Sequence, residues 1–292
     1  MRRGWIGSQA HRDAFCGVFI ETHRPFDPQA IQWPDLDDES LRRLKALPIW
    51  NEAVRTETAT ALEVQTLGRV EEDPVLAQAI ALQGYEEGRH AAILTLLTRH
   101  YGIPVTSFDP PKPPKNPRAT FLSTGYGECL DSFFAFGLFA IGKRSGYFPS
   151  SIIDIFDPIL QEEARHILFI VNWAAYLRAR TPWARRPAFD ARRAWIIGRQ
   201  LFDHARQAIR FGGSDGASQE GFTMASHSAF ENLSARSFLA LCLSENDRRL
   251  ALYDSRLRRP RLVAPIVRIV LELLPERSAR PVPERARSSG RV

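Results

Sequence analysis

The chain has 292 residues, and its composition is typical of a folded protein rather than of a disordered or fibrous one. Hydrophobic residues make up 44% of it, which is enough to bury the core of one large helical domain. No apolar run reaches the length of a membrane span, and residues 1–5 are not followed by the apolar segment of a signal peptide. We therefore expect a cytoplasmic protein with no membrane partner.

The net charge of the chain bears on the kind of macromolecule it could bind. There are 39 Lys and Arg residues against 33 Asp and Glu, which gives a net charge of +6 that comes mostly from arginine. The positive charge is dispersed, with a local excess over residues 185–199, and we interpret it as a solvated surface. The alternatives are an acidic protein partner, and nucleic acid, which we do not expect. Cys16, Cys129 and Cys242 are scattered and odd in number, which is typical of reduced thiols.

The first half of the chain predicts two long helices after a leader. Residues 1–46 have short helical potential broken by Pro and Asp, and we expect them to pack on the rest of the domain. Helical periodicity then covers about 48–70 and about 74–101. Between these helices Asp73 reads as the N-cap and Pro74 as the first helical residue.

The second half repeats this arrangement after a long connection. A Pro-rich segment, residues 105–117, is long enough to cross the length of a bundle, and helices are expected over about 120–144 and 150–180. The sequence therefore predicts an all-α fold with a four-helix bundle over residues 47–180 and one long crossover. Further helices at about 187–211, 234–257 and 261–274 belong to accessory residues 181–277 of the same domain, and residues 278–292 read as a disordered tail.

Two copies of one short motif stand out. Glu87 and His90 form a Glu-x-x-His motif on the second helix, and Glu163 and His166 form another on the fourth. In each copy an acid precedes the Glu and an Arg precedes the His. Residues three apart share one helix face, so each motif projects a carboxylate and an imidazole in one direction. Helical bundles bind two metal ions with this pair of motifs and one Glu from each of two further helices.

Turn geometry selects the two further Glu residues. In an antiparallel helical hairpin, residues equidistant from the turn lie at the same level. The midpoint between Glu57 and Glu87 falls in the first predicted turn, and the midpoint between Glu128 and Glu163 falls in the second. Glu63 is the main rival to Glu57, but its helix face is polar and reads as solvated.

Charge supports a metal site at this level. A buried carboxylate without a partner costs several kcal/mol, so four of them require compensation. Two divalent cations match four carboxylates, and two neutral imidazoles complete the donor set. One motif alone is a weak signal, whereas the coincidence of spacing, level and facing is a strong one. The predicted metal ligands are Glu57, Glu87, His90, Glu128, Glu163 and His166.

The paired motifs resemble those of the ferritin-like di-iron carboxylate superfamily. They are especially similar to its oxidase branch, which includes acyl-carrier-protein desaturases, the ribonucleotide reductase small subunit and related oxygenases and N-oxygenases. The resemblance covers residues 47–180 and implies a ferritin-like four-helix bundle with two iron ions, or a Mn/Fe pair. It also implies that the neighbours of the ligands, Glu86, Arg89, Glu162 and Arg165, orient them, the alternative being surface ion pairs.

The resemblance implies an activity as well. We expect a non-haem di-iron oxidoreductase with O2 as co-substrate that hydroxylates, desaturates or N-oxygenates a small-molecule or carrier-bound organic substrate. An electron donor such as a ferredoxin and a homodimeric assembly are expected with it. The alternative is a non-catalytic ferritin-like protein that binds metal or stores iron, against which the length of the chain and its extra helices argue.

Some positions depart from the resemblance or add to it. Leu94 stands where reductase small subunits carry a radical Tyr, and Ile159 stands where N-oxygenases could place a third His. His204 is the only other candidate for such a ligand, and we interpret it as a structural or surface histidine. Ser132 lies one turn after Glu128 on the same face and is the predicted catalytic proton donor. The alternative for Ser132 is a hydroxyl bonded to a backbone carbonyl.

Overall fold

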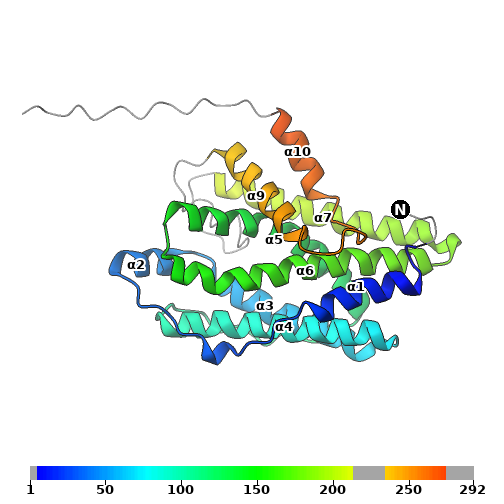
Figure 1. The fold of residues 1–292 in the computed structure, drawn as a ribbon, viewed down its shortest axis with the longest axis horizontal. Helices are drawn as coiled ribbons and strands as arrows, with labels where there is room; N and C mark the ends of the chain where they lie inside the picture. Colours follow the sequence, from blue (N-terminus) through cyan, green and yellow to red (C-terminus); the bar gives the residue numbers. More distant parts are fainter. Residues whose placement is uncertain (1–4, 213–233, 274–292) are drawn as a thin grey trace, which may run out of the picture.

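A computed structural model describes residues 5–212 and 234–273. Within these ranges the protein contains nine α-helices and two short 3-10 helices, and no strand, which confirms the all-α prediction. The helices form an elongated stack in which α3, α4, α5 and α6 lie along the long axis (Figure 1). No helix in the described ranges is long and apolar enough to cross a membrane. The predicted disordered tail lies outside the described residues.

Four helices make the centre of the molecule. They are α3 (Trp50–Val70), α4 (Pro74–His100), α5 (Pro117–Ser145) and α6 (Ser150–Arg180). The start of α4 is as the sequence predicts, because the Asp73 side chain accepts hydrogen bonds from the backbone N–H groups of the first turn and Pro74 is the first helical residue. The fourth helix continues through Pro158. Helices predicted from periodicity are therefore present with ends within a few residues.

The connection between α4 and α5 crosses the length of the central helices. Near its start, the backbone N–H of Thr106 donates a 2.6 Å hydrogen bond to Asn51 at the beginning of α3. At its end, Arg118 in the first turn of α5 lies 3.2 Å from Glu71, just after the end of α3. The connection therefore runs the length of α3, whereas the turns inside the pairs α3–α4 and α5–α6 are short. Each pair is antiparallel as a result.

Glycines let the central helices approach closely. A Cβ atom added at Gly84 of α4 would lie 2.9 Å from the backbone nitrogen of Gln65 on α3, so no larger residue fits there. A Cβ at Gly125 of α5 would lie 2.5 Å from Ile170 on α6. Close approach at these positions holds the ligand-bearing faces of each helix pair together.

The remaining helices cover the central four. Helix α1 (Gln9–Glu21) packs on α6 and α4 and buries Phe15 and Phe19. It is longer than the short helical potential expected of the leader, and α2 (Asp38–Ala46) follows after the 3-10 turn η1 (Pro28–Ala30). After η2 (Trp183–Arg185), helix α7 (Arg186–Gly212) packs on α5. Helix α9 (Ala235–Leu250) also packs on α5, and α10 (Val263–Leu273) packs on α9.

One predicted helix is too long. The periodic pattern runs to residue 257, but α9 ends at Leu250. Asp254 accepts a 2.9 Å hydrogen bond from the backbone N–H of Arg256, which favours a turn at this place. Leu257 is buried in the central core, and it produces the apolar periodicity without being helical.

Candidate metal centre

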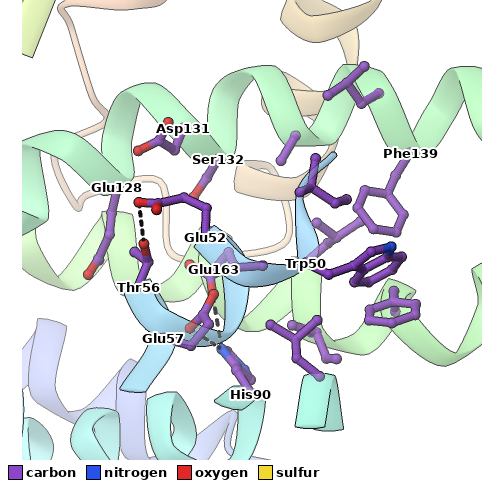
Figure 2. A pocket seen from close by; sticks show the side chains of 18 of the residues that line it. Trp50, Glu52, Thr56, Glu57, His90, Glu128, Asp131, Ser132, Phe139 and Glu163 are labelled. Carbon is purple, nitrogen blue, oxygen red and sulfur yellow. Dashed lines mark hydrogen bonds and ion pairs between the residues drawn. The ribbon is translucent and has the colours of Figure 1, made fainter. Parts of the chain in front are cut away.

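All six predicted ligands meet in the middle of the four central helices. Helix α3 contributes Glu57, α5 contributes Glu128, and α4 and α6 contribute the two Glu-x-x-His motifs. Figure 2 shows four of these six side chains, Glu57, His90, Glu128 and Glu163. The donor atoms form two groups, within each of which they lie within 4.8 Å of one another. One group contains Glu57, Glu87, His90 and Glu163, and the other contains Glu87, Glu128 and His166. Hairpin geometry therefore selected residues that do converge.

Two of the carboxylates lie between the two imidazoles. Glu87 Oε1 is 2.9 Å from Nδ1 of His166, and its Oε2 is 3.8 Å from Nδ1 of His90. Glu163 does the reverse, with Oε1 3.0 Å from His90 and Oε2 3.7 Å from His166. Glu57 lies only with His90, at 3.8 Å, and Glu128 only with the His166 group. The centre thus has a His90 half and a His166 half, with Glu87 and Glu163 between them.

The other nitrogen of each imidazole is held by a carboxylate from the opposite helix. Nε2 of His90 lies 2.9 Å from Glu162, whose second oxygen accepts from Arg89. Nε2 of His166 lies 2.9 Å from Glu86, whose second oxygen accepts from Arg165. We call these the Glu162 triad (Arg89, Glu162, His90) and the Glu86 triad (Arg165, Glu86, His166). Outer carboxylates of this kind fix the orientation of a metal-ligating imidazole and leave Nδ1 facing the centre.

Burial decides between the two interpretations of the residues around the motifs. Glu86 is 0% exposed, Arg165 2%, Arg89 3% and Glu162 6%. The surface ion-pair alternative is therefore wrong. These side chains form buried ion pairs that contact the two histidines.

The electrostatics show how strongly negative charge is concentrated. Burial raises the pKa of Glu57 and Glu128 well above its usual value, and the charges of Glu87 and Glu163 raise it further. The Glu57 side chain is 28% exposed, so solvent reaches part of it. Burial also raises the pKa of Glu163, but hydrogen bonds with the two imidazoles outweigh burial and lower it.

The imidazoles respond in the opposite sense. Burial lowers the pKa of His90, but hydrogen bonds with Glu162 and Glu163 outweigh it and raise the pKa well above its usual value. Burial likewise lowers the pKa of His166, and the charge of Glu87 with the hydrogen bonds to its carboxylate neighbours raises it well above. Without another cation, protons gather at the centre to balance the carboxylates.

Several buried donor atoms at the centre lack a well-aligned hydrogen-bond partner in the described part of the chain. These are Nδ1 of His90, Nδ1 of His166 and both carboxylate oxygens of Glu128. Buried polar atoms are nearly always paired, so a group of such atoms in one place needs an explanation. Carboxylate oxygens and neutral imidazole nitrogens are the donors that iron and manganese prefer. The residues present therefore fit two divalent cations.

A cavity of about 630 Å³ adjoins the cluster. Its volume is within the range of pockets that hold small organic ligands. Carboxylates of the centre lie at one part of its wall, and apolar side chains line much of the rest, among them Trp50, Leu94, Phe139, Phe148, Ile152 and Phe156. Ser132 is 6% exposed and lines the cavity next to Glu128 on α5 (Figure 2).

Charged side chains from α3, α5 and α7 line another part of the cavity. Glu52 and Arg55 form an ion pair of 2.6 Å on α3, and Glu52 accepts a 3.1 Å hydrogen bond from Thr56 (Figure 2). Arg199 and Asp203 of α7 lie 3.6 Å apart. The cavity thus joins an apolar region to a polar one, with the cluster beside both.

Sequence reasoning placed some residues differently or missed them. Glu63, the rival of Glu57, accepts a 2.6 Å hydrogen bond from Thr124 and belongs to neither group. Gln83 is fully buried and donates to Glu87 Oε1 at 3.3 Å, and its place on the apolar seam of α4 was a usable signal. His23, which contacts Glu86, follows α1 in an irregular segment, where no periodicity could indicate it. The side chain of His204, the other candidate ligand, is not among those that the structure describes.

No family model matches this chain, and neither the curated proteins nor the solved structures contain a significant match. The function is therefore inferred from the geometry and chemistry of the cluster and of the cavity beside it.

Proposed function

We propose that this chain is a ferritin-like di-iron oxidoreductase that uses O2 to oxidise an organic substrate held in the cavity. The observation that carries the proposal is the convergence of four carboxylates and two imidazoles from four helices beside a cavity of about 630 Å³. Pairs of Glu-x-x-His motifs with two further Glu residues are the donor set of di-metal helical bundles.

The connectivity of the central helices supports the ferritin-like interpretation. Two antiparallel pairs, α3–α4 and α5–α6, are joined by one segment that runs the length of α3. A single long crossover between two helical hairpins is the arrangement of ferritin-like bundles. Both the motif and the connectivity thus favour the same superfamily.

Each half of the centre has its own ligands for one ion. Glu57, His90 and Glu163 would hold one ion, Glu128 and His166 would hold the other, and Glu87 belongs to both groups of donor atoms. When bound, two Fe(II) ions, or a Mn/Fe pair, would supply the electrons that reduce O2. The chain itself holds the ligands in place through the buried triads.

The cavity walls and one hydroxyl supply the rest of the chemistry. Apolar side chains such as Trp50 and Phe139 would bind the apolar part of a substrate and keep water away. Ser132 would hold a proton at the wall beside Glu128 and deliver it during the oxidation. Leu94 lines the same cavity, so no tyrosine stands at that position to form a radical. A ferredoxin-like donor would return electrons, and a homodimer stays a prediction.

Metal content and oxygen consumption test the proposal together. Protein purified from iron-replete cells is expected to carry close to two metal ions per chain, mainly iron, and to consume O2 within minutes after reduction. Absence of any bound transition metal would contradict the proposed centre. Oxidation with mineralisation of hundreds of irons per assembly would favour the storage alternative. Stability of the reduced, iron-loaded protein in air for hours would exclude the oxidase function.

A further inference from the structure

The carboxylates of the two triads differ in their further partners. In each, a buried carboxylate accepts from one imidazole and one guanidinium. Glu86 has a further partner, because Nδ1 of His23 bonds to the same oxygen that Arg165 contacts. Among the described residues, Glu162 has no third hydrogen bond of this kind: Arg165 approaches it at 4.0 Å, and a ring nitrogen of His23 lies within 4.8 Å of it. The symmetry between the two halves of the centre is therefore broken at His23.

His23 lies in a segment that covers both triads. This segment, residues 22–26, follows α1, and each triad arginine contacts it. Arg165 approaches the Thr22 hydroxyl at 3.5 Å, and Arg89 donates a 3.2 Å hydrogen bond to the backbone carbonyl of Arg24. The Arg89 guanidinium also lies 3.9 Å from the centre of the Phe26 ring. Packing on both sides thus holds the segment, and with it the His23 ring, against the outer face of the centre.

The contacts of His23 lead to one half of the centre. The His23 ring is bonded to Glu86, and Glu86 holds Nε2 of His166 at 2.9 Å. Nδ1 of His166 faces Glu87 at 2.9 Å and belongs to the group that contains Glu128. Towards the other half, residues 22–26 reach Arg89 through the Arg24 carbonyl and the Phe26 ring, and Arg89 in turn bonds to Glu162, which holds Nε2 of His90. In the described ranges, His23 is the one side chain of this segment that bonds directly to a carboxylate holding one of the two imidazoles. Loss of His23 would therefore loosen Glu86 and, through it, the orientation of only one ligand ring.

We infer that His23 is a positioning residue for the His166 half of the metal centre and makes the two metal positions unequal. This inference rests on the proposed function only in requiring that the cluster binds two metal ions. A carboxylate with three fixed partners holds an imidazole more firmly than one with two close partners. Outer partners of metal-ligating histidines commonly change metal affinity about 10- to 100-fold. The ion in the His166 half is accordingly bound more tightly than the ion in the His90 half.

Single-position variants make the test specific. Glu57→Gln removes a ligand found only in the His90 group, and Glu128→Gln removes one found only in the His166 group. The full-length protein of each background is titrated with Co²⁺ alone by calorimetry. We expect His23→Ala to weaken Co²⁺ binding about tenfold in the Glu57→Gln background. In the Glu128→Gln background the affinity should stay within about twofold.

Two controls separate positioning from general loss of structure. His23→Gln keeps an amide that can donate to Glu86 and should restore most of the affinity. His100→Ala removes an exposed histidine at the C-terminal end of α4, ten residues after His90, and should change neither position. Melting temperatures of all variants without metal show whether each one folds. An equal loss in both backgrounds, no loss in either, or failure of Gln to rescue would overturn the inference.

The same experiment distinguishes the inference from the proposed function. If the parent protein binds no Co²⁺, both are wrong. If the parent binds two Co²⁺ ions and the His23 variants show no preference for one half, only the inference is wrong. If the preference is found but the reduced iron form does not react with O2, the inference stands and the oxidase function is wrong.

Discussion

The two sides of the metal centre are built differently. On the α4–α6 side, each imidazole is held by a buried carboxylate and each of these carboxylates by a buried arginine. On the α3–α5 side, Glu128 has two buried oxygens without a hydrogen-bond partner in the described ranges, and Glu57 borders the cavity. The α4–α6 side is therefore fixed before any ion binds, whereas the α3–α5 side would be held mainly by the ions it binds.

This difference has a physical reason. A carboxylate buried beside other carboxylates is compensated by cations, and the two buried arginines next to the motifs, Arg89 and Arg165, pair with Glu162 and Glu86 on the α4–α6 side. Glu57 and Glu128 therefore depend on protons or metal ions for compensation. The side that faces the cavity is thus the adjustable one, which is where a substrate and O2 would approach.

The largest effect is expected from breaking a triad on the fixed side. Arg165→Ala leaves Glu86 buried without its guanidinium, and such a loss typically costs about 3–5 kcal/mol of unfolding free energy. Arg55→Ala is the matched control, because it removes an exposed arginine that pairs with Glu52 and should cost no more than about 1 kcal/mol. Denaturant unfolding of the metal-free proteins measures both. Equal losses of unfolding free energy in the two variants would show that the triads do not stabilise the α4–α6 side.

Metal removal comes next and acts on the adjustable side. A ligand that binds only the folded state stabilises it, by about 2.7 kcal/mol when its free concentration is 100 times the dissociation constant. Chelator should therefore lower the melting temperature near neutral pH. Glu87→Ala should lose most of the metal and with it most of this difference. Identical melting curves with and without chelator would contradict a shared buried site.

The pH dependence of stability in the metal-free protein should distinguish the two sides of the centre. The folded-state pKa of Glu128 is raised, so its contribution to stability is full below the unfolded value near 4.5 and is lost as the pH rises through the folded value. Each unit of raised pKa corresponds to about 1.4 kcal/mol. Glu128→Gln should remove this part of the decline above pH 4.5, as followed by chemical unfolding between pH 5 and 9. If the variant lost stability with pH as much as the parent does, Glu128 would not be the source of the decline.

The fixed side should show the opposite trend in acid. Burial raises the pKa of Glu86, but hydrogen bonds with His166 and the charges of His166 and Arg165 outweigh it and lower the pKa to about 2. Its contribution is therefore present above the unfolded value near 4.5 and is lost as the pH falls towards 2. Glu86→Gln should flatten the acid limb of the stability curve and leave the alkaline limb in place.

The smallest effect on stability is expected from Ser132. Ser132→Ala removes one hydroxyl from the cavity wall and should change the melting temperature little. Metal content should stay near that of the parent, while oxidation of substrate slows if the hydroxyl delivers a proton. Stopped-flow oxidation of the reduced protein compares the two. Unchanged rates would leave Ser132 as a residue of the cavity wall only.

Local sequence features were enough to predict the helices and the six side chains that meet at the centre. Apolar periodicity, the Asp73–Pro74 start signal and the Pro-rich connection are local features, and each is read from neighbouring residues. Glu57 and Glu128 could be selected because antiparallel hairpins place residues at equal distances from the turn at one level. Helix geometry and short turns alone set this level, so the positions of the turns in the sequence were sufficient to locate both ligands.

The side chains that contact the motif histidines from outside, and the cavity, could be found only in the folded structure. The sequence shows an acid and an arginine beside each motif, but not that Glu86 serves His166 and Glu162 serves His90 across the helices. His23 reaches Glu86 from 63 positions away through an irregular segment that has no periodic signal. The cavity is likewise made by side chains from several helices, so its shape depends on how they pack. Contacts between segments distant in sequence are set by packing, and local patterns cannot specify them.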